Sequence, residues 1–267
     1  MATILELRHP GLPLAWGDGG EVMRDVTRLV MLLPSQVVDL AVALDLFDSS
    51  REVSAAWKHP KFYWDEDRKA EAEVGAHLEE QACATKGRPL TMPERHAIRE
   101  ASRDLVRRAA WHKGRLPMEY VQRPMFMHAR SFIYALDTIG CVLRVLSGID
   151  AVPPGVSQQK LAFDEHFPEL RDVRNSAHHV EDRVRGLGPS ERKISLEPVD
   201  LPPLLSADAG VALLGETLVD RSFGCTLANG SYGRVEISLD SALRARNCVQ
   251  GVLDAFTGSG SPVQWPL

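Results

Sequence analysis

The stretch from Pro124 to Leu146 constrains the fold of this chain more than any other. Large apolar side chains recur through it at helical spacing and leave little polar surface: Met125, Phe126, Phe132, Ile133, Leu136, Ile139, Val142, Leu143 and Leu146. A helix that is apolar around most of its circumference has to be covered by other elements on several sides. We therefore expect it to be the central helix of a bundle.

Apolar spacing or helix-favouring composition predicts further helices at residues 22–33, 35–47, about 65–84, 91–112 and 168–186. Pro34 is expected to separate the first two, with Ser35 capping the second. Thr91 and Glu94, three positions apart, have the pattern of a capping box. The sequence thus predicts a bundle of several antiparallel helices.

The pattern changes after Pro189, where short apolar clusters predict strands at residues 193–196, 213–218, 223–227 and 235–237. Asn229-Gly230 favours a hairpin turn between the last two. A final helix is expected over residues 241–256. The prediction is a mainly α protein, with an extended arm at residues 1–20, a helical bundle at 21–188 and a C-terminal β-hairpin plus helix at 189–267.

Composition narrows the class of protein. The 267 residues are 44% hydrophobic, which is enough for a sizeable core, and the four cysteines form no C-x-x-C pair. We expect a soluble cytoplasmic protein without a signal peptide or membrane span, and no metal or other cofactor. A net charge of −5 argues against a protein that holds long nucleic acids by a general positive field. A stripe of arginines at residues 95, 99, 103 and 107 is interpreted first as a solvated face, because acidic residues are interleaved with it.

Functional interest centres on Arg174-Asn175-Ser176-Ala177-His178-His179, which places a guanidinium, an amide and two imidazoles within six residues. On an ideal helix, five apolar residues share one side and are expected to face the core: Leu170, Val173, Ala177, Val180 and Val184. Asn175 and His179 fall nearly opposite them, and Arg174 and His178 on the flank. The competing interpretation is an ordinary salt-bridged surface, in which each ion pair contributes about 0–1 kcal/mol.

Arg174, Asn175 and His179 resemble the signature of the HEPN domain family, in which four to six residues separate an Arg from a His and the residue after the Arg is usually polar. Four residues separate Arg174 from His179, which is the shortest form of the pattern. The resemblance covers about residues 21–188. It implies a helical bundle that dimerises through the motif helices. In many members it also implies metal-independent cleavage of RNA, by attack of the ribose 2′-hydroxyl on the phosphate.

By this resemblance, Arg174 would stabilise the scissile phosphate and His179 would transfer a proton. Asn175 would orient the phosphate or the His, and His178 is a second candidate for the acid or base. Guanidinium and imidazole suit this chemistry, because one pairs with phosphate oxygens and the other titrates near neutral pH. On an ideal helix His179 lies about 140° from Arg174. A composite site formed by two motif helices across a two-fold axis is therefore expected.

The Tyr that follows the His in some family members is absent, because Val180 and Glu181 stand there. A non-catalytic HEPN-like dimerisation or interaction module therefore stays open beside the ribonuclease, which could be a toxin or a phage-defence effector held by an inhibitory protein. A different hydrolase or transferase is a third class, but the chain has no nucleophile-elbow, P-loop, zinc-protease or dinucleotide-binding pattern to support it.

Overall fold

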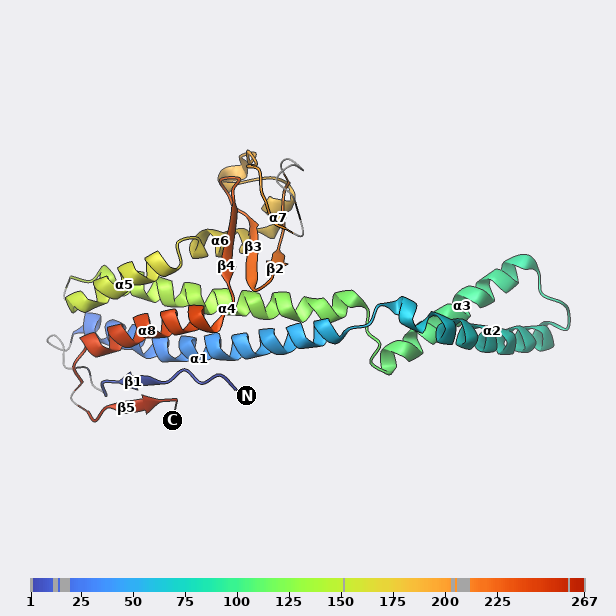
Figure 1. Ribbon diagram of the computed structural model, residues 1–267, viewed down its shortest axis with the longest axis horizontal. Helices are drawn as coiled ribbons and strands as arrows, with labels where there is room; N and C mark the ends of the chain where they lie inside the picture. The colour runs from blue at the N-terminus through green and yellow to red at the C-terminus, as the bar shows by residue number, and fades with distance from the viewer. Residues whose placement is uncertain are drawn as a thin grey trace. The chain divides into compact units, whose positions relative to one another are not determined.

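The computed structural model describes residues 2–11, 14, 20–150, 152–202, 205, 212–258 and 260–266. Its longer helices are α1 (Glu21–Ala56), α2 (Trp64–Lys86), α3 (Met92–His112), α4 (Met118–Ser147), α5 (Pro154–His166), α6 (Leu170–His178) and α8 (Leu239–Ala255). Shorter elements are α7 (Val180–Val184) and the 3-10 turns η1 (Pro60–Tyr63) and η2 (Pro189–Glu191). Five short strands complete the described part, β1 (Leu7–His9), β2 (Thr217–Val219), β3 (Ser222–Thr226), β4 (Tyr232–Glu236) and β5 (Val263–Trp265) (Figure 1). The predicted mainly α class is confirmed.

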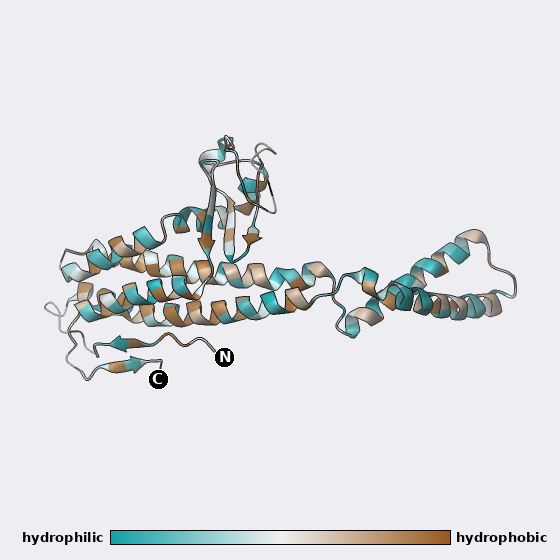
Figure 2. Ribbon diagram, in the orientation of Figure 1, coloured by the Kyte–Doolittle hydropathy of each residue, from teal (hydrophilic) through white to brown (hydrophobic). Residues whose placement is uncertain are grey.

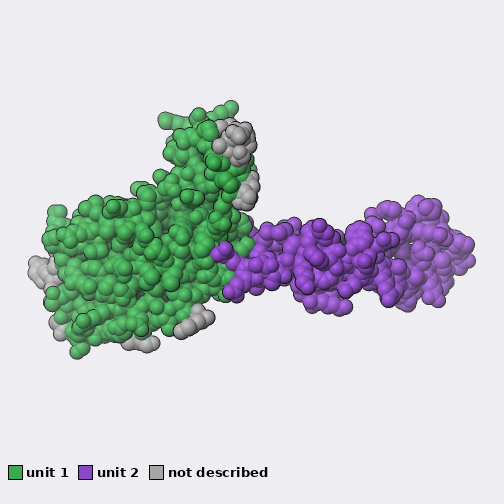
Figure 3. All heavy atoms as spheres, in the orientation of Figure 1, with its two compact units in different colours: residues 1–49, 125–267 green, residues 50–124 purple. Residues whose placement is uncertain are grey.

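The chain divides into two compact units (Figure 3). Residues 1–49 and 125–267 form the main unit, and residues 50–124 form the hairpin unit. The boundaries fall inside α1 and α4, so this division differs from the three consecutive segments outlined from the sequence. Each unit is described separately below.

The core of the main unit is a single cluster of apolar side chains from α1, α4, α5, α6, α8 and the strands β3 and β4. The apolar positions of α4 lie inside it, and Phe132, Leu136 and Ile139 have no solvent exposure. Hydrophobic residues recur along both α1 and α4 (Figure 2). The expected burial of this helix is therefore confirmed, and the C-terminal strands and helix share its core rather than forming a core of their own.

The predicted interruption at Pro34 is wrong, because α1 runs through it without a break. Val30, Leu33 and Val37 on both sides of the proline are buried in the same core. Their packing, about 1.5–3 kcal/mol for each side chain, offsets the roughly 3 kcal/mol that an internal proline costs. Ser35 does not cap a new helix, since its hydroxyl donates to the carbonyl of Leu32 at 2.7 Å.

Helix α5 was not predicted from the sequence, where Pro153-Pro154-Gly155 indicates only a turn. Pro154 occupies the first turn of the helix, where its missing N–H costs nothing. Phe163 anchors α5 to the core with 2% exposure. A Cβ at Gly140 of α4 would lie 2.9 Å from the Phe163 ring, so the glycine allows the two helices to approach closely.

Strands β2, β3 and β4 form an antiparallel sheet in that order, with Thr217 opposite Gly224 and Cys225 opposite Gly233. Asn229-Gly230 lies in the predicted turn, and Gly230 has a φ of +96°. The strand expected at 193–196 is absent, since the described residues there show only an isolated bridge between Lys193 and Leu187. The sheet packs against α6, and the backbone N–H of Arg234 donates to Glu169 just before that helix.

Part of the expected N-terminal arm forms β1, which pairs antiparallel with β5 near the other end of the chain. Leu5, Leu7 and Leu14 are buried in the core of the main unit. Residues 12, 13 and 15–19 of the arm lie outside the described residues. Within the described part, α1 alone is long and apolar enough to cross a membrane, and 44% of its most apolar window is buried in the protein.

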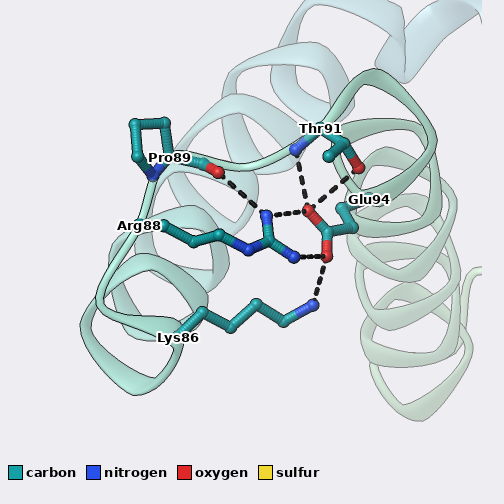
Figure 4. A network of polar contacts seen from close by, with 5 residues as sticks. All are labelled: Lys86, Arg88, Pro89, Thr91 and Glu94. Carbon is teal, nitrogen blue, oxygen red and sulfur yellow. Dashed lines mark hydrogen bonds and ion pairs between the residues drawn. The ribbon is translucent and has the colours of Figure 1, made fainter.

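In the hairpin unit, α2 and α3 pack against each other. The predicted capping box is confirmed, because Glu94 accepts from the N–H of Thr91 at 2.7 Å and from its hydroxyl at 3.0 Å. Arg88 donates to both oxygens of the same carboxylate, and Lys86 donates to one (Figure 4). These partners hold the pKa of Glu94 well below its usual range, with Arg88 the largest cause. One carboxylate thus fixes the connection between two helices.

Candidate functional site

The motif segment is two helices rather than the single one predicted over residues 168–186. Helix α6 ends at His178, and His179 links it to α7 with φ −99° and ψ 49°. The change of direction exposes Val180 and Val184, which were expected in the core, to 45% and 70%. Arg183 is buried in their place, and its guanidinium donates to the Ser176 hydroxyl and to the carbonyl of Leu187. The helical-wheel prediction therefore holds for α6 and fails after the break.

Arg174 is fixed by a carboxylate that the motif does not include. Its Nε and Nη2 both donate to Oδ2 of Asp137 on α4, at 2.8 and 2.5 Å. The side chain of Asp137 is 8% exposed and that of Arg174 is 29% exposed. A third donor, Nη1, binds Oδ1 of Asn175 at 2.9 Å. Asn175 therefore contacts the guanidinium of Arg174, whereas the sequence led us to expect that it orients the phosphate or the His.

These contacts leave part of the guanidinium available to a ligand. An arginine has five N–H groups, and the contacts to Asp137 and Asn175 use three of them. Burial alone disfavours the charged form of Arg174, but the hydrogen bond and negative charge of Asp137 outweigh it and raise the pKa. Arg174 is consequently a permanent, pre-oriented cation with two free donors, and the charge of Asp137 largely offsets its own.

His178 is brought to the same side of α6 by a contact with α4. Its Nδ1 lies 3.2 Å from the hydroxyl of Tyr134, one helical turn before Asp137. The ring is exposed, and its centroid is 5.2 Å from that of His179. Arg174, Asn175, His178 and Tyr134 therefore form one continuous polar strip where α4 and α6 meet.

His179 lies beside this strip at the helix break, where its side chain is 53% exposed. Its Nδ1 is 3.7 Å from a carboxylate oxygen of Glu181. Together with Asp182, these two residues place three possible metal-ligating atoms within 4.8 Å of one another. Asp182, however, is already paired with Arg185 at 2.5 Å. The group is therefore better suited to holding the His179 ring than to binding a cation tightly.

Asp137 and Tyr134 were not predicted as site residues, because the apolar character of α4 indicated only a core helix. A signal was present, since Tyr134, Asp137 and Cys141 are polar or reactive residues at spacings of three and four in an otherwise apolar helix. Such a carboxylate is buried only when it has a partner. Its spacing alone could not identify that partner as Arg174, 37 residues away.

A groove of about 410 Å³ between α1 and α4 borders the polar strip. Val42 and Leu46 of α1 are 52% and 45% exposed along it, and Tyr134 lines it on the α4 side. The polar strip is thus continuous with an exposed apolar surface. Such a combination is typical of surfaces that contact another protein chain.

Comparisons of the chain with models of protein families, with curated proteins and with solved structures found no match. The chemistry of the site therefore has to be argued from its own geometry. It offers one anchored cation, two exposed imidazoles and a phenol. These groups can bind an anion and move protons around it.

Proposed function

We propose that this protein is a metal-independent endoribonuclease of the HEPN type that acts as a homodimer. The observation that carries the proposal is the clustering of Arg174, Asn175 and His178 on one accessible strip, with His179 next to it. Helix α6 is held in place by the Asp137 contact and by the sheet behind it. The site is therefore rigid enough to orient a phosphate.

In the reaction, the two free donors of Arg174 bind non-bridging oxygens of the scissile phosphate. One imidazole accepts the proton of the ribose 2′-hydroxyl as its oxygen attacks phosphorus. A second imidazole protonates the departing 5′-oxygen. The products are a 2′,3′-cyclic phosphate and a free 5′-hydroxyl, so every proton and oxygen is accounted for without an external reactant.

A two-fold arrangement follows from the charges. Within one chain, the negative charge of Asp137 offsets most of the attraction of Arg174 for a phosphate. An arginine paired in this way stabilises the negative charge of a phosphorane only weakly. Two motif helices facing each other would bring a second guanidinium and two more imidazoles to the same cleft. The groove between α1 and α4, with the exposed Val42 and Leu46 along it, supplies the surface that such a contact would bury.

The decisive experiment is complementation between two inactive variants. Arg174→Ala and His179→Ala are each expected to lower cleavage of single-stranded RNA by about a hundredfold or more, the scale of losing one transition-state donor. Mixed after unfolding and refolding together, they should regain part of the activity, because the shared cleft of the mixed dimer then holds one wild-type Arg174 and one wild-type His179. His166→Ala and Arg24→Ala, exposed residues elsewhere in the main unit, are matched controls with unchanged activity.

Several outcomes would contradict the proposal. Equal activity in wild type and both variants would indicate a contaminant or another site. Loss of activity in EDTA would contradict metal independence. Inactive variants that do not complement would restrict the site to one chain.

A second candidate is a non-catalytic dimerisation or interaction module, and the Asp137–Arg174 pair favours it specifically, because a neutralised arginine is a common interface residue. In that case no RNA would be cleaved by any of the proteins. The Arg174 and His179 substitutions would instead weaken self-association in sedimentation experiments. The ribonuclease proposal also includes a cytoplasmic location and an inhibitory protein partner. Co-expression of the protein with a candidate partner tests the second of these.

A further inference from the structure

A cavity with a volume of about 850 Å³ lies in the hairpin unit. It is bounded by the end of α1, η1, the first turns of α2, the last turns of α3 and the segment that leads into α4. All of its lining residues belong to the hairpin unit, whose every residue is described. Its size falls within the range of small-molecule sites in proteins.

The cavity occupies the place where the unit would otherwise have a core. Over residues 50–124 four apolar residues are buried, Leu90, Val106, Ala110 and Val121, and the last three line the cavity. Around them, Val53, Trp111 and Leu116 also line the cavity, and 60%, 39% and 43% of their surface is exposed. A ligand with a flat apolar body would cover that surface.

Aromatic rings define the shape of the space. Trp57, directly after α1, and Trp111 of α3 line it, and Tyr63 lines it from η1. The indole N–H of Trp57 donates to the carbonyl of Leu116 at 3.0 Å, which fixes the orientation of that ring. The guanidinium of Arg115 lies over Tyr63, with its carbon 4.6 Å from the ring centroid. Fixed rings of this kind favour a planar ligand that stacks on them.

An incompletely satisfied carboxylate faces the same space. Oδ1 of Asp67 is buried and accepts no hydrogen bond, although Nη1 of Arg115 lies 3.0 Å away as an ion-pair partner. The ion pair compensates the negative charge of Asp67, although the two groups are not oriented as in a hydrogen bond. The side chain of Asp67 is 32% exposed and lines the cavity, so its second carboxylate oxygen is the one that an N–H donor of a ligand can reach.

Cations predominate at the rim. Lys58, Arg103 and Arg107 line the cavity and are exposed. Arg103 is only loosely paired with Glu71, at 3.6 Å, and Lys58 has no ion pair in the described structure. The hairpin unit has 15 Lys and Arg against 12 Asp and Glu, a net charge of +3 in a chain whose total is −5. An anionic group on the ligand would be attracted to this edge.

We propose that this cavity binds a nucleotide with an amino-substituted purine base. The base stacks on the aromatic walls, a ring or exocyclic N–H donates to Asp67, and the phosphate lies against Lys58 and Arg103. Guanosine monophosphate has all three features, since adjacent N–H groups of guanine match one carboxylate. The proposal concerns a unit separate from the motif residues and does not depend on RNA cleavage.

Binding is measured by isothermal titration calorimetry with the full-length protein. Guanosine monophosphate should bind saturably. Guanosine, which lacks the phosphate, and uridine monophosphate, whose single ring covers less of the walls, should each bind about tenfold more weakly or worse. A short single-stranded RNA with one guanine distinguishes the source of the nucleotide, because it competes with the free nucleotide only if the pocket also accepts a base within a strand.

Matched variants locate the binding. Ala56→Trp places a ring in the cavity, whereas Ala55→Trp changes the neighbouring exposed residue of the same helix, which does not line it. Lys58→Glu is matched in the same way by Lys61→Glu. We expect about a tenfold or greater loss of affinity in the first member of each pair and no change in the second. Circular dichroism checks that all four variants keep the helical content of wild type.

A third pair tests the hydrogen bond. Asp67→Asn should abolish the preference for the purine with an amino group over inosine monophosphate, and Asp65→Asn should leave it intact. The proposal is overturned if no nucleotide binds saturably up to about 1 mM, or if both members of a pair lose affinity equally. Binding of an uncharged aromatic compound as tight as that of the nucleotide would also overturn it, and would indicate an apolar partner surface instead.

Discussion

Removing the ion pair between Asp137 and Arg174 tests whether it anchors α6 to α4. The perturbation is a double-mutant cycle made of Asp137→Ala, Arg174→Ala and the double variant. Two hydrogen bonds join the residues through one carboxylate oxygen, at 2.8 and 2.5 Å. The cycle isolates the free energy of that contact from the separate effects of each side chain.

The structure fixes the expected magnitude. A hydrogen bond to a charged group contributes about 1.5–3 kcal/mol, whereas an exposed ion pair contributes about 0–1 kcal/mol. Because Arg174 is 29% exposed and Asp137 only 8%, water screens one partner and not the other. We therefore expect a coupling of about 1.5 kcal/mol. Arg174→Ala should cost more than Asp137→Ala, since it leaves the better-buried charge without a partner.

The assay is amide hydrogen exchange of α4 and α6 peptides across a urea series, which reports the main unit without the hairpin unit. Lys160→Ala and Asp164→Ala form the control cycle, because that pair is more exposed and lies within one helix turn of α5. Its coupling should stay below about 0.5 kcal/mol. Equal values in the two cycles, or a larger loss for Asp137→Ala than for Arg174→Ala, would refute the reasoning from burial.

Three further predictions concern residues outside the site. Burial raises the pKa of Cys225 to about 12, so iodoacetamide at pH 8 should leave it unmodified in the native protein and label the partly exposed Cys83, as mass spectrometry would show. The stabilisation from ionised Glu94 should be complete above an ordinary carboxyl pKa of about 4.3 and lost as pH falls through its lowered value. The protection of amides in the α2–α3 hairpin, measured as their exchange rate relative to the intrinsic rate at each pH, should therefore fall only at the acid end between pH 6 and pH 2, and Glu94→Gln should remove that dependence. Gly224→Ala should cost about 1–3 kcal/mol in urea denaturation, because the new Cβ would lie 2.2 Å from the hydroxyl of Tyr232, and an unchanged midpoint would contradict the packing seen there.

Helix existence was predictable wherever apolar spacing and caps agree. The capping box at Thr91 and the apolar face of α4 are local signals, and both are confirmed. Pro34 and α5 were not predictable for the same reason, since in each case tertiary packing outweighs the local signal. Phe163 contributes one large buried side chain to α5, and no pattern along the sequence reveals that Gly140 leaves room for it.

The candidate site was predictable in its residues and not in its contacts. Arg174, Asn175 and His178 do lie together, as the spacing on one helix requires. The break at His179 was not visible, because Val180 and Val184 continue the apolar period beyond it. The buried Arg183 donates hydrogen bonds to Ser176 and Leu187, and these contacts outweigh the apolar pattern. A straight helix would leave these polar groups without those hydrogen bonds.

The partner of Arg174 decides between the two functions considered for the motif. A phosphate that approaches a single chain meets a guanidinium whose charge Asp137 already offsets, so attraction has to come from elsewhere. A facing copy of α6 would supply it, because the second Arg174 brings two more free donors and the paired imidazoles bring charge when protonated. In the proposed homodimer, catalysis would therefore depend on dimerisation through electrostatics. If the variants of Arg174 and His179 complement each other, the dimer is the enzyme; if the protein is a stable dimer that cleaves no RNA, the same pairing with Asp137 is what makes the arginine an interface residue.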